Sequence, residues 1–339
     1  MTDRRFRVVA VGLALALSVS AAACKDKDNA GSQPKPAQTT SAASPSASAT
    51  SASPTPSSSP TPTAAKYDPL TGGKKSDNVV VAVKIDNVAA ARPQVGINRA
   101  DMVVVERVEG NLTRMMAIFH TEFPHRVGPV RSARNTDVRL LPMFGKPALV
   151  FSGANRKVLR QVRHSPYVRP VKRVNRDYRR VAPHNVIVHL NNVAKLPDIG
   201  KARPMGYTFG SGSQWKSAAE ATSVKIDIGV DTFGFKYTDG RYQTRWNGQL
   251  NADGDTHKPV LTDNIVRLKV KSKPDTQTTS KKSNVAETIG SGEAIVYSQG
   301  KKVSGTWKRD KLNGPMTLKD AHGKNIPLKK GKTWILLDG

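Results

Sequence analysis

Cysteine is almost absent from this chain, and so are the common signatures of bound cofactors. Cys24 is the only cysteine among 339 residues, so no disulfide can form within the chain. A zinc site would have to rely on histidine and carboxylate ligands, and no HExxH or H-x-H spacing occurs. The sequence also lacks a phosphate-binding GxxxxGK[ST] loop and a G-x-S-x-G serine elbow. We therefore expect neither a metal nor a cofactor.

Long apolar runs are also missing, with one short exception at the start of the chain. Val8–Ala23 contains sixteen residues without a charge, whereas a membrane-spanning helix needs about 20. Three arginines precede this run and three alanines end it, directly before Cys24. A basic start, a short apolar stretch and small residues form an export signal.

A cysteine directly after the small residues is typical of a bacterial lipobox. Its thiol takes a lipid and becomes the mature N-terminus. An uncleaved anchor and ordinary secretion are the alternatives, but the run is short and the cysteine stands at the lipobox position. We predict a lipoprotein signal peptide over residues 1–23, lipidation of Cys24, and a protein anchored to the cell membrane outside the cytoplasm.

Acidic residues are few. The chain has 54 Lys and Arg against 26 Asp and Glu, a formal net charge of +28. Between residues 131 and 203 there are 17 basic and three acidic side chains. Such a segment attracts polyanions. Because we expect export, nucleic acid is not an expected partner. The expected partners are anionic lipids, envelope polymers or a cell-wall protein. A solvated basic surface without a specific ligand is the alternative.

The composition divides the chain into a tether and two folded parts. Residues 24–66 are dominated by Ser, Thr, Ala and Pro, which predicts a disordered tether. Residues 67–215 mix strand and helix patterns, with a hairpin turn at Gly110-Asn111. Residues 224–339 consist of short alternating runs separated by turns. We predict an α+β fold, with an N-terminal mixed α/β-type domain followed by a mainly β C-terminal domain.

Several polar motifs follow one another along the part of the chain expected to fold. They include Ala91-Arg92-Pro93-Gln94, Gly128-Pro129-Val130-Arg131-Ser132-Ala133-Arg134, Arg180-Val181-Ala182-Pro183-His184-Asn185, Gly305-Thr306-Trp307 and Gly331-Lys332-Thr333-Trp334. This pattern resembles the YerB-like lipoproteins, a bacterial envelope family of unknown function, from about residue 78 to residue 337. The resemblance implies a two-domain exported lipoprotein and implies no particular reaction.

The same motifs suggest a site for an anion. Arg131 and Arg134 flank an expected helix start with Ser132 as its N-cap, where free N–H groups and guanidinium forks would hold phosphate or carboxylate. The candidate binding residues are Asn87, Arg92, Arg114, Arg131, Ser132, Arg134, Arg180, His184 and Asn185. Alternatively, Arg131 and Arg134 are internal struts that pair with Glu106 and Glu109.

An enzymatic role is a second hypothesis. Glu106, Glu109 and His184 are the catalytic candidates, as acids or bases of an envelope hydrolase or transferase acting on a glycan or phosphoester. However, positions three apart on a regular strand point to opposite faces, which separates Glu106 from Glu109. We therefore favour a non-enzymatic protein that binds an anionic envelope polymer, a lipid or a cell-wall partner.

Overall fold

The computed structural model describes residues 67–172, 174–276, 278 and 283–339. The expected signal peptide, Cys24 and the tether lie outside these residues. The described residues belong to one compact unit. Within them, every helix is too short or too polar to cross a bilayer.

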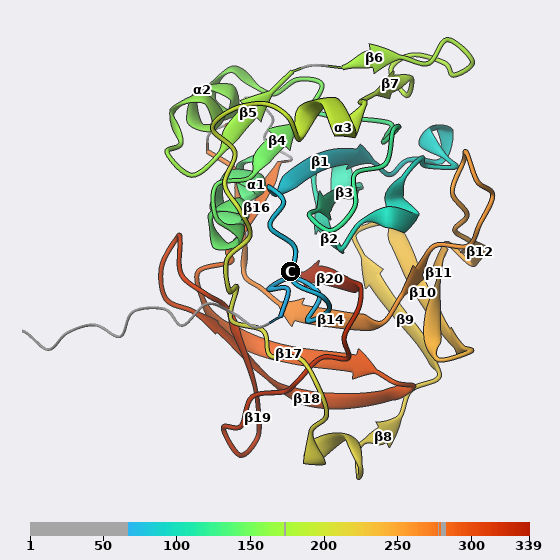
Figure 1. Ribbon diagram of the computed structural model, residues 1–339, viewed down its shortest axis with the longest axis vertical. Helices are drawn as coiled ribbons and strands as arrows, with labels where there is room; N and C mark the ends of the chain where they lie inside the picture. The colour runs from blue at the N-terminus through green and yellow to red at the C-terminus, as the bar shows by residue number, and fades with distance from the viewer. Residues whose placement is uncertain (1–66, 173, 277, 279–282) are drawn as a thin grey trace, which may run out of the picture. The chain divides into compact units, whose positions relative to one another are not determined.

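A large mixed sheet runs through the centre of this unit (Figure 1). Its eleven strands follow the order β19-β18-β17-β14-β20-β2-β3-β1-β4-β5, and β8 pairs with β18. The strands are β1 Val81–Asp86, β2 Met102–Arg107, β3 Thr113–Phe119, β4 Ala148–Val150, β5 Arg169–Val171, β8 Ala219–Glu220, β14 Asn264–Lys269, β17 Gly290–Ser298, β18 Lys301–Arg309, β19 Thr317–Asp320 and β20 Thr333–Asp338. β2 pairs in parallel with β20, so the N-terminal and C-terminal parts of the chain share one sheet.

Smaller sheets and short helices surround this sheet. A second sheet contains β9 Ser223–Ile228, β10 Asp231–Thr238, β11 Arg241–Trp246, β12 Gln249–Leu250 and β13 Leu261–Thr262. Two-stranded pairs are formed by β6 Asn175–Arg176 with β7 Val186–Ile187, and by β15 Ser272–Pro274 with β16 Asn284–Ala286. The helices are α1 Asn135–Leu140, α2 Arg156–His164 and α3 Leu190–Val193, with 3-10 turns η1 Ala89–Ala91, η2 Ile97–Arg99, η3 Glu109–Asn111, η4 Leu141–Phe144 and η5 Ser213–Trp215.

The expected fold class is confirmed: strands dominate, helices are few, and the C-terminal part is mainly β. β2 and β3 form the expected hairpin, and Gly110 adopts a left-handed φ of 64° at its turn. The helix expected to start at Ser132 begins at Asn135 and ends at Leu140. Pro142 lacks the N–H that a continuing α-helix needs, and the chain tightens from α1 into η4 around it.

The central strands are buried on both faces, which explains their apolar sequence. On β1, Val81, Val83 and Ile85 enter one core, while Ala82 enters the other. The first core packs the sheet against the second sheet, including Phe233 of β10. The other core lies under α1, η4 and α2. Because strand side chains alternate between faces, the last residues of these strands can present polar groups on either side.

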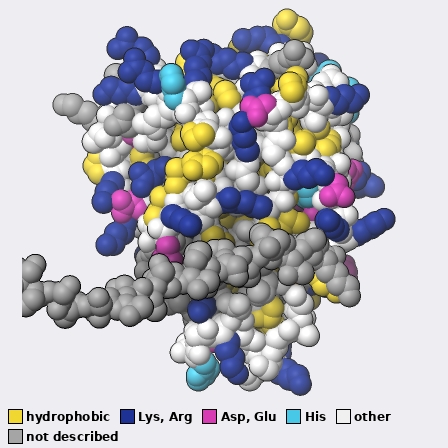
Figure 2. All heavy atoms as spheres, turned by 60° about the vertical axis from the view of Figure 1, so that its left-hand side comes forward, with side chains coloured by type: hydrophobic (Ala, Val, Ile, Leu, Met, Phe, Trp, Pro, Cys, Tyr) yellow, Lys and Arg dark blue, Asp and Glu magenta, His cyan; other side chains and the backbone are white. Residues whose placement is uncertain are grey.

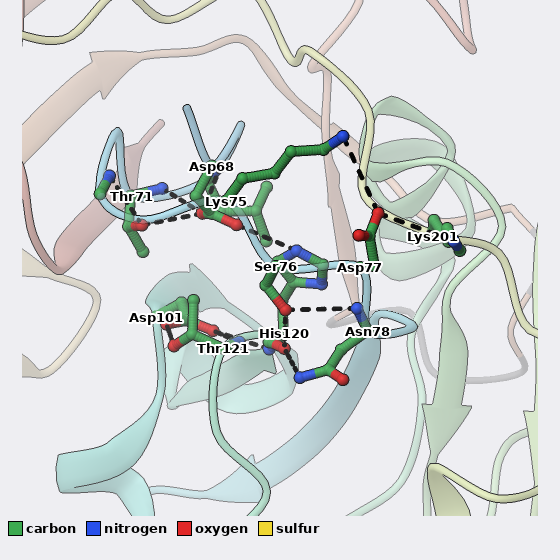
Figure 3. A network of polar contacts seen from close by, with 12 residues as sticks. Asp68, Thr71, Lys75, Ser76, Asp77, Asn78, Asp101, His120, Thr121 and Lys201 are labelled. Atoms are coloured by element: carbon green, nitrogen blue, oxygen red, sulfur yellow. Dashed lines mark hydrogen bonds and ion pairs between the residues drawn. The ribbon is translucent and has the colours of Figure 1, made fainter. Parts of the chain in front are cut away.

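A buried ionic contact fastens the first described turn to the end of β3 (Figure 3). His120 Nε2 lies 3.0 Å from Asp68 Oδ2, outside hydrogen-bond geometry, so the contact is an ion pair when His120 is protonated. The other Asp68 oxygen accepts from the Thr71 backbone N–H at 2.8 Å. Asp101 accepts from the backbone N–H groups of His120 and Thr121 at 2.6 and 2.8 Å. The first described residues are thus held by charge as well as by packing.

This ion pair predicts a pH-dependent stability. Burial alone would lower the pKa of His120, but contact with Asp68 outweighs it and raises that pKa above its ordinary 6.5. Burial alone would raise the pKa of Asp68, but contact with His120 and Thr71 outweighs it and lowers that pKa below its ordinary 3.8. The pair therefore contributes its full stabilisation of the folded state between pH 3.8 and pH 6.5, the ordinary pKa values of the two groups. Its contribution is lost as the pH rises through the raised pKa of His120 or falls through the lowered pKa of Asp68.

The variant His120→Gln tests this dependence. We expect it to lower the free energy of unfolding by about 3 kcal/mol near pH 6, because a buried charge loses its partner. Urea unfolding should be measured from pH 5 to alkaline pH. The difference in free energy of unfolding between the variant and wild type should shrink as the pH rises. The exposed His322 provides a control, since His322→Gln should leave stability unchanged. A gap that is constant with pH would contradict the ion pair.

Candidate functional site

Charged side chains lie on one face of the central sheet, where β1 and β2 end and β3 begins. Arg114 of β3 stands directly opposite Asp86 of β1 on one side and Glu106 of β2 on the other. Direct cross-strand neighbours project from the same face of a sheet. Lys84, two residues before Asp86 on β1, shares that face. Strand pairing therefore brings two cations and two carboxylates together.

Lys84 and Glu106 form the buried base of this group. The Lys84 ammonium contacts the Glu106 carboxylate and lies 2.6 Å from Oδ1 of Asp137, a residue of α1. Burial raises the pKa of Glu106, and the charge of Lys84 acts in the opposite direction. Glu106 is fully enclosed and paired. It is placed as an internal ion-pair partner, not as an acid or base at the surface, and its partner is Lys84 in place of the arginines considered from the sequence.

Asp86 is the centre of the more accessible part of the site. His184 places Nδ1 2.8 Å from Asp86 Oδ2, and Arg131 Nε lies 3.1 Å from the same oxygen. The Arg131 N–H is not aligned for a hydrogen bond, so that contact is an ion pair. The side chain of His184 is 16% exposed, whereas that of Asp86 is buried. A buried carboxylate thus orients an imidazole that reaches the surface.

Arg134 forms an ion pair with the second candidate carboxylate, Glu109. Its Nε and Nη2 both lie 2.9 Å from Glu109 Oε2. Burial would raise the pKa of Glu109, but the charge of Arg134 outweighs it and holds that pKa below its ordinary value. Glu106 and Glu109 therefore have different partners, Lys84 and Arg134. Their contacts do not form the carboxylate pair that glycoside hydrolysis requires.

Arg114 is the unusual member of the group. It is only 9% exposed, and its guanidinium makes no hydrogen bond or ion pair with any residue that the structure describes. Burial and the nearby charge of Arg134 lower the pKa of Arg114 to about 10. Asp86 and Glu109 act on it electrostatically, but each already has an arginine of its own. A buried cation without a direct partner is costly unless a ligand supplies one.

The start of α1 differs from the expectation. The helix begins at Asn135, so Arg134, not Ser132, occupies the N-cap position, and its backbone N–H donates to Asp137 at 2.7 Å. With six residues the helix is too short to supply an anion site at its N-terminus. Ser132 instead lines a cavity of about 240 Å³ together with Glu109, Arg134 and Asn155. An anion here would depend on guanidinium groups.

Arg92 and Asn87 belong to a different contact, where the N-terminal part meets the second sheet. Arg92 donates to Asn87 Oδ1 and to Asn251 Oδ1, each at 2.5 Å. Its guanidinium stacks over the Trp246 ring, 4.1 Å from the centroid. Burial lowers the pKa of Arg92 to about 10. These bonds make Arg92 a link between the two parts of the chain.

Arg180 and Asn185 are also occupied by internal bonds. Arg180 donates to the backbone carbonyls of Ala91 and Pro93, at 3.4 and 2.5 Å. Asn185 accepts from Arg176 at 2.9 Å. Of the expected binding residues, Arg131 and His184 contact Asp86 and Arg114 stands opposite it in the sheet. Arg134 contacts Glu109 and shares a cavity with Ser132. Among the described residues, no three His, Cys, Asp or Glu side chains are arranged to hold a metal ion.

Sequence reasoning missed Lys84 and Asp137 and did not place Asp86 in the binding set. A signal for Lys84 was present: it interrupts an apolar strand on a position that shares a face with Ala82. A charge at such a position predicts a buried partner. The partner itself could not be read from the sequence, because Asp137 is 53 residues away.

The fold is thus a mixed sheet built from two consecutive segments, with arginine, carboxylate and histidine side chains clustered at one end. The chain belongs to the family described as protein of unknown function DUF3048: residues 70–203 match its N-terminal domain and residues 223–335 its C-terminal domain. The boundary expected between residues 215 and 224 stays a prediction.

A sequence comparison and a structure comparison confirm the resemblance inferred from the motifs. The chain is 28% identical over 292 residues to the Bacillus subtilis (strain 168) protein named "Putative lipoprotein YerB", with 79% of this chain and 84% of the relative covered. A crystal structure of YerB protein from Bacillus subtilis matches with a TM-score of 0.69 at 26% identity, covering 80% of this chain and 96% of that one. The name of the relative assigns it no reaction or ligand.

The buried ion cluster predicts an unequal response to the loss of two lysines. Lys84→Met should lower the free energy of unfolding by about 3–5 kcal/mol, because Glu106 and Asp137 would be left buried without a cation. Lys146 forms a matched but exposed pair with Asp198. Lys146→Met should cost about 1 kcal/mol or less. Urea unfolding at neutral pH compares the two, and similar losses would refute the buried-cluster assignment.

Proposed function

We propose that this protein is a lipid-anchored envelope protein that binds an anionic group at an arginine cluster. The arginine cluster consists of Arg114, Arg131 and Arg134, with Asp86 and His184 beside them. The ligand group is a phosphate or carboxylate, carried by an envelope polymer, a lipid or a cell-wall partner. The observation that carries the proposal is the buried Nη1 of Arg114, which has no hydrogen-bond partner among the described residues.

Charge balance supports an anion at this place. Arg131 pairs with Asp86 and Arg134 pairs with Glu109. Arg114 is therefore the arginine of this cluster without an ion-pair partner among the described residues. A phosphate or carboxylate has several acceptor oxygens and can bond more than one guanidinium at once. His184, partly exposed and held by Asp86, adds a donor when it is protonated. The ligand is therefore an oxyanion in preference to a neutral sugar or an apolar group.

The anchor is proposed from the chain's own start and from its relative. The basic, apolar and small-residue segments end at Cys24, and the related protein of Bacillus subtilis carries the name of a lipoprotein. Cys24→Ala should abolish lipid attachment and signal cleavage at that residue. The mass of the mature protein then lacks the lipid increment that wild type shows. A variant that still carries lipid would contradict the assignment of Cys24.

The arginine cluster is tested by titration with inorganic phosphate and glycerol phosphate. Wild type should bind both, and added salt should weaken binding because partly exposed charges are screened. Arg114→Gln should weaken binding roughly tenfold or more, as expected for loss of a charge-assisted hydrogen bond. The same change should leave the free energy of unfolding unchanged or raise it, since it removes an unpaired buried charge.

The control is Arg99→Gln, which removes an arginine from an exposed pair with Glu122. It should leave phosphate affinity at the wild-type value. If Arg114→Gln keeps phosphate affinity and destabilises the protein by several kcal/mol, Arg114 is an internal strut and the binding proposal fails.

An envelope hydrolase or transferase is the second candidate function. One contact favours it: Asp86 holds Nδ1 of His184, which leaves the other ring nitrogen available for proton exchange. Glu109, bound to Arg134, is the nearby carboxylate that remains partly exposed. Turnover of glycan or phosphoester substrates that His184→Gln abolishes, with phosphate binding retained, would favour this candidate. Absence of turnover on peptidoglycan, teichoic-acid and phosphoester substrates would exclude it for those substrates.

A further inference from the structure

Two large hydrophobic side chains are exposed together on one loop. Tyr178 is 89% and Val181 80% exposed, more than any other large hydrophobic residue in the described part of the chain. Both lie between β6 and β7, on the segment from residue 175 to residue 187, which we call the β6–β7 arm. Figure 1 shows this arm extending beyond the central sheet at the upper edge of the molecule.

The exposure does not come from a loose loop. Asp177 accepts from Arg179 and Arg126 side chains, which hold its pKa well below the ordinary value. Backbone bonds close the arm, from Asp177 N–H to the Asn185 carbonyl at 2.8 Å and from His184 N–H to the Val181 carbonyl at 2.9 Å. The Arg180 side chain also links the arm to the backbone carbonyls of Ala91 and Pro93. The fold thus holds Tyr178 and Val181 outward in a fixed conformation.

The surroundings of the arm are strongly basic. Residues 156–184 contain ten Lys or Arg and a single acidic residue, Asp177. On α2 the exposed face carries Arg156, Lys157, Arg160 and Arg163, while Val158 and Val162 are buried. Figure 2 shows Lys and Arg side chains gathered along the top of the molecule, the side on which α2 and the arm lie in Figure 1. Exposed apolar groups therefore project from a cationic surface.

We infer that the β6–β7 arm docks on an anionic lipid membrane. Tyr178 and Val181 would enter the boundary between headgroups and acyl chains, and the arginines around them would meet lipid phosphates. A soluble polyanion would attract the arginines equally well, but it would gain nothing from the exposed tyrosine and valine. The combination of a cationic surface with an apolar tip is what an anionic bilayer interface matches.

This docking goes beyond the proposed anion site, since it uses other residues. It also has a geometric consequence, because His184 at the base of the arm contacts Asp86 in the arginine cluster. Docking would turn that cluster toward the headgroup layer. Two side chains give only modest affinity, which suffices for a protein whose lipid anchor keeps it at high local concentration near the membrane.

The test uses the chain from residue 60 onward, which contains the compact unit and lacks Cys24. Vesicles of phosphatidylcholine alone are compared with vesicles that also contain phosphatidylglycerol. Wild type should sediment with the anionic vesicles only. The double variant Tyr178→Ser/Val181→Ser should lower its partition roughly tenfold, as expected for loss of two inserted side chains. The control Val230→Ser/Leu250→Ser removes residues that are 57% and 43% exposed elsewhere, and it should bind like wild type.

Three results would overturn the inference. They are equal partition of wild type and the Tyr178/Val181 variant, equal binding to neutral and anionic vesicles, and binding of soluble poly(glycerol phosphate) without vesicle binding. The last would make the arm a polymer-binding surface. The Tyr178/Val181 variant should bind inorganic phosphate like wild type, so a failure of the docking inference can be told apart from a failure of the arginine-cluster proposal.

Discussion

The site depends on one buried cation, the ammonium of Lys84, which lies where β1, β2 and α1 meet. A charge removed from water must be paired, and here Glu106 and Asp137 provide the pairing. Because these carboxylates come from a strand and a helix, the pairing also determines where α1 begins. Asp137 binds the backbone N–H of Arg134 as well, which positions the arginine that holds Glu109. The buried ion cluster thus supports the more exposed group above it, in which Asp86, Arg131 and His184 meet.

The sheet gives this arrangement its rigidity. β2 lies between β3 and β20, so the strand that carries Glu106 is paired on both edges. β20 comes from the end of the chain, and the C-terminal part therefore completes the sheet on which the N-terminal site stands. Arg92 adds a second link, through Asn251 and the face of Trp246. Family comparison separates two domains, yet the pairing of β2 with β20 makes their relative position part of the site's support.

Local patterns were sufficient to predict the β2–β3 hairpin and the α+β class, because alternation and turn residues act over short distances. They failed at Ser132, since the position of a short helix depends on the distant pairing of Asp137 with Lys84. They also could not divide the candidate arginines into groups. Asp86 ends β1 and Asn87 follows it outside the strand, and their partners differ: Arg131 pairs with Asp86, whereas Arg92 donates to Asn87. Only strand pairing reveals which polar residues share a face.

Arg92 and Arg114 are both buried and both have a pKa lowered to about 10, yet they differ in their partners. Arg92 is bonded to three amide oxygens and stacked on an indole, as expected of a structural link. Arg114 has neither kind of contact within the described part of the chain, and its guanidinium neighbours add repulsion. A fold whose stability alone mattered would lose little by replacing it with a neutral side chain. Folded proteins retain such local costs mainly at functional positions, and this arginine stands directly opposite Asp86, the carboxylate that holds His184 at the surface.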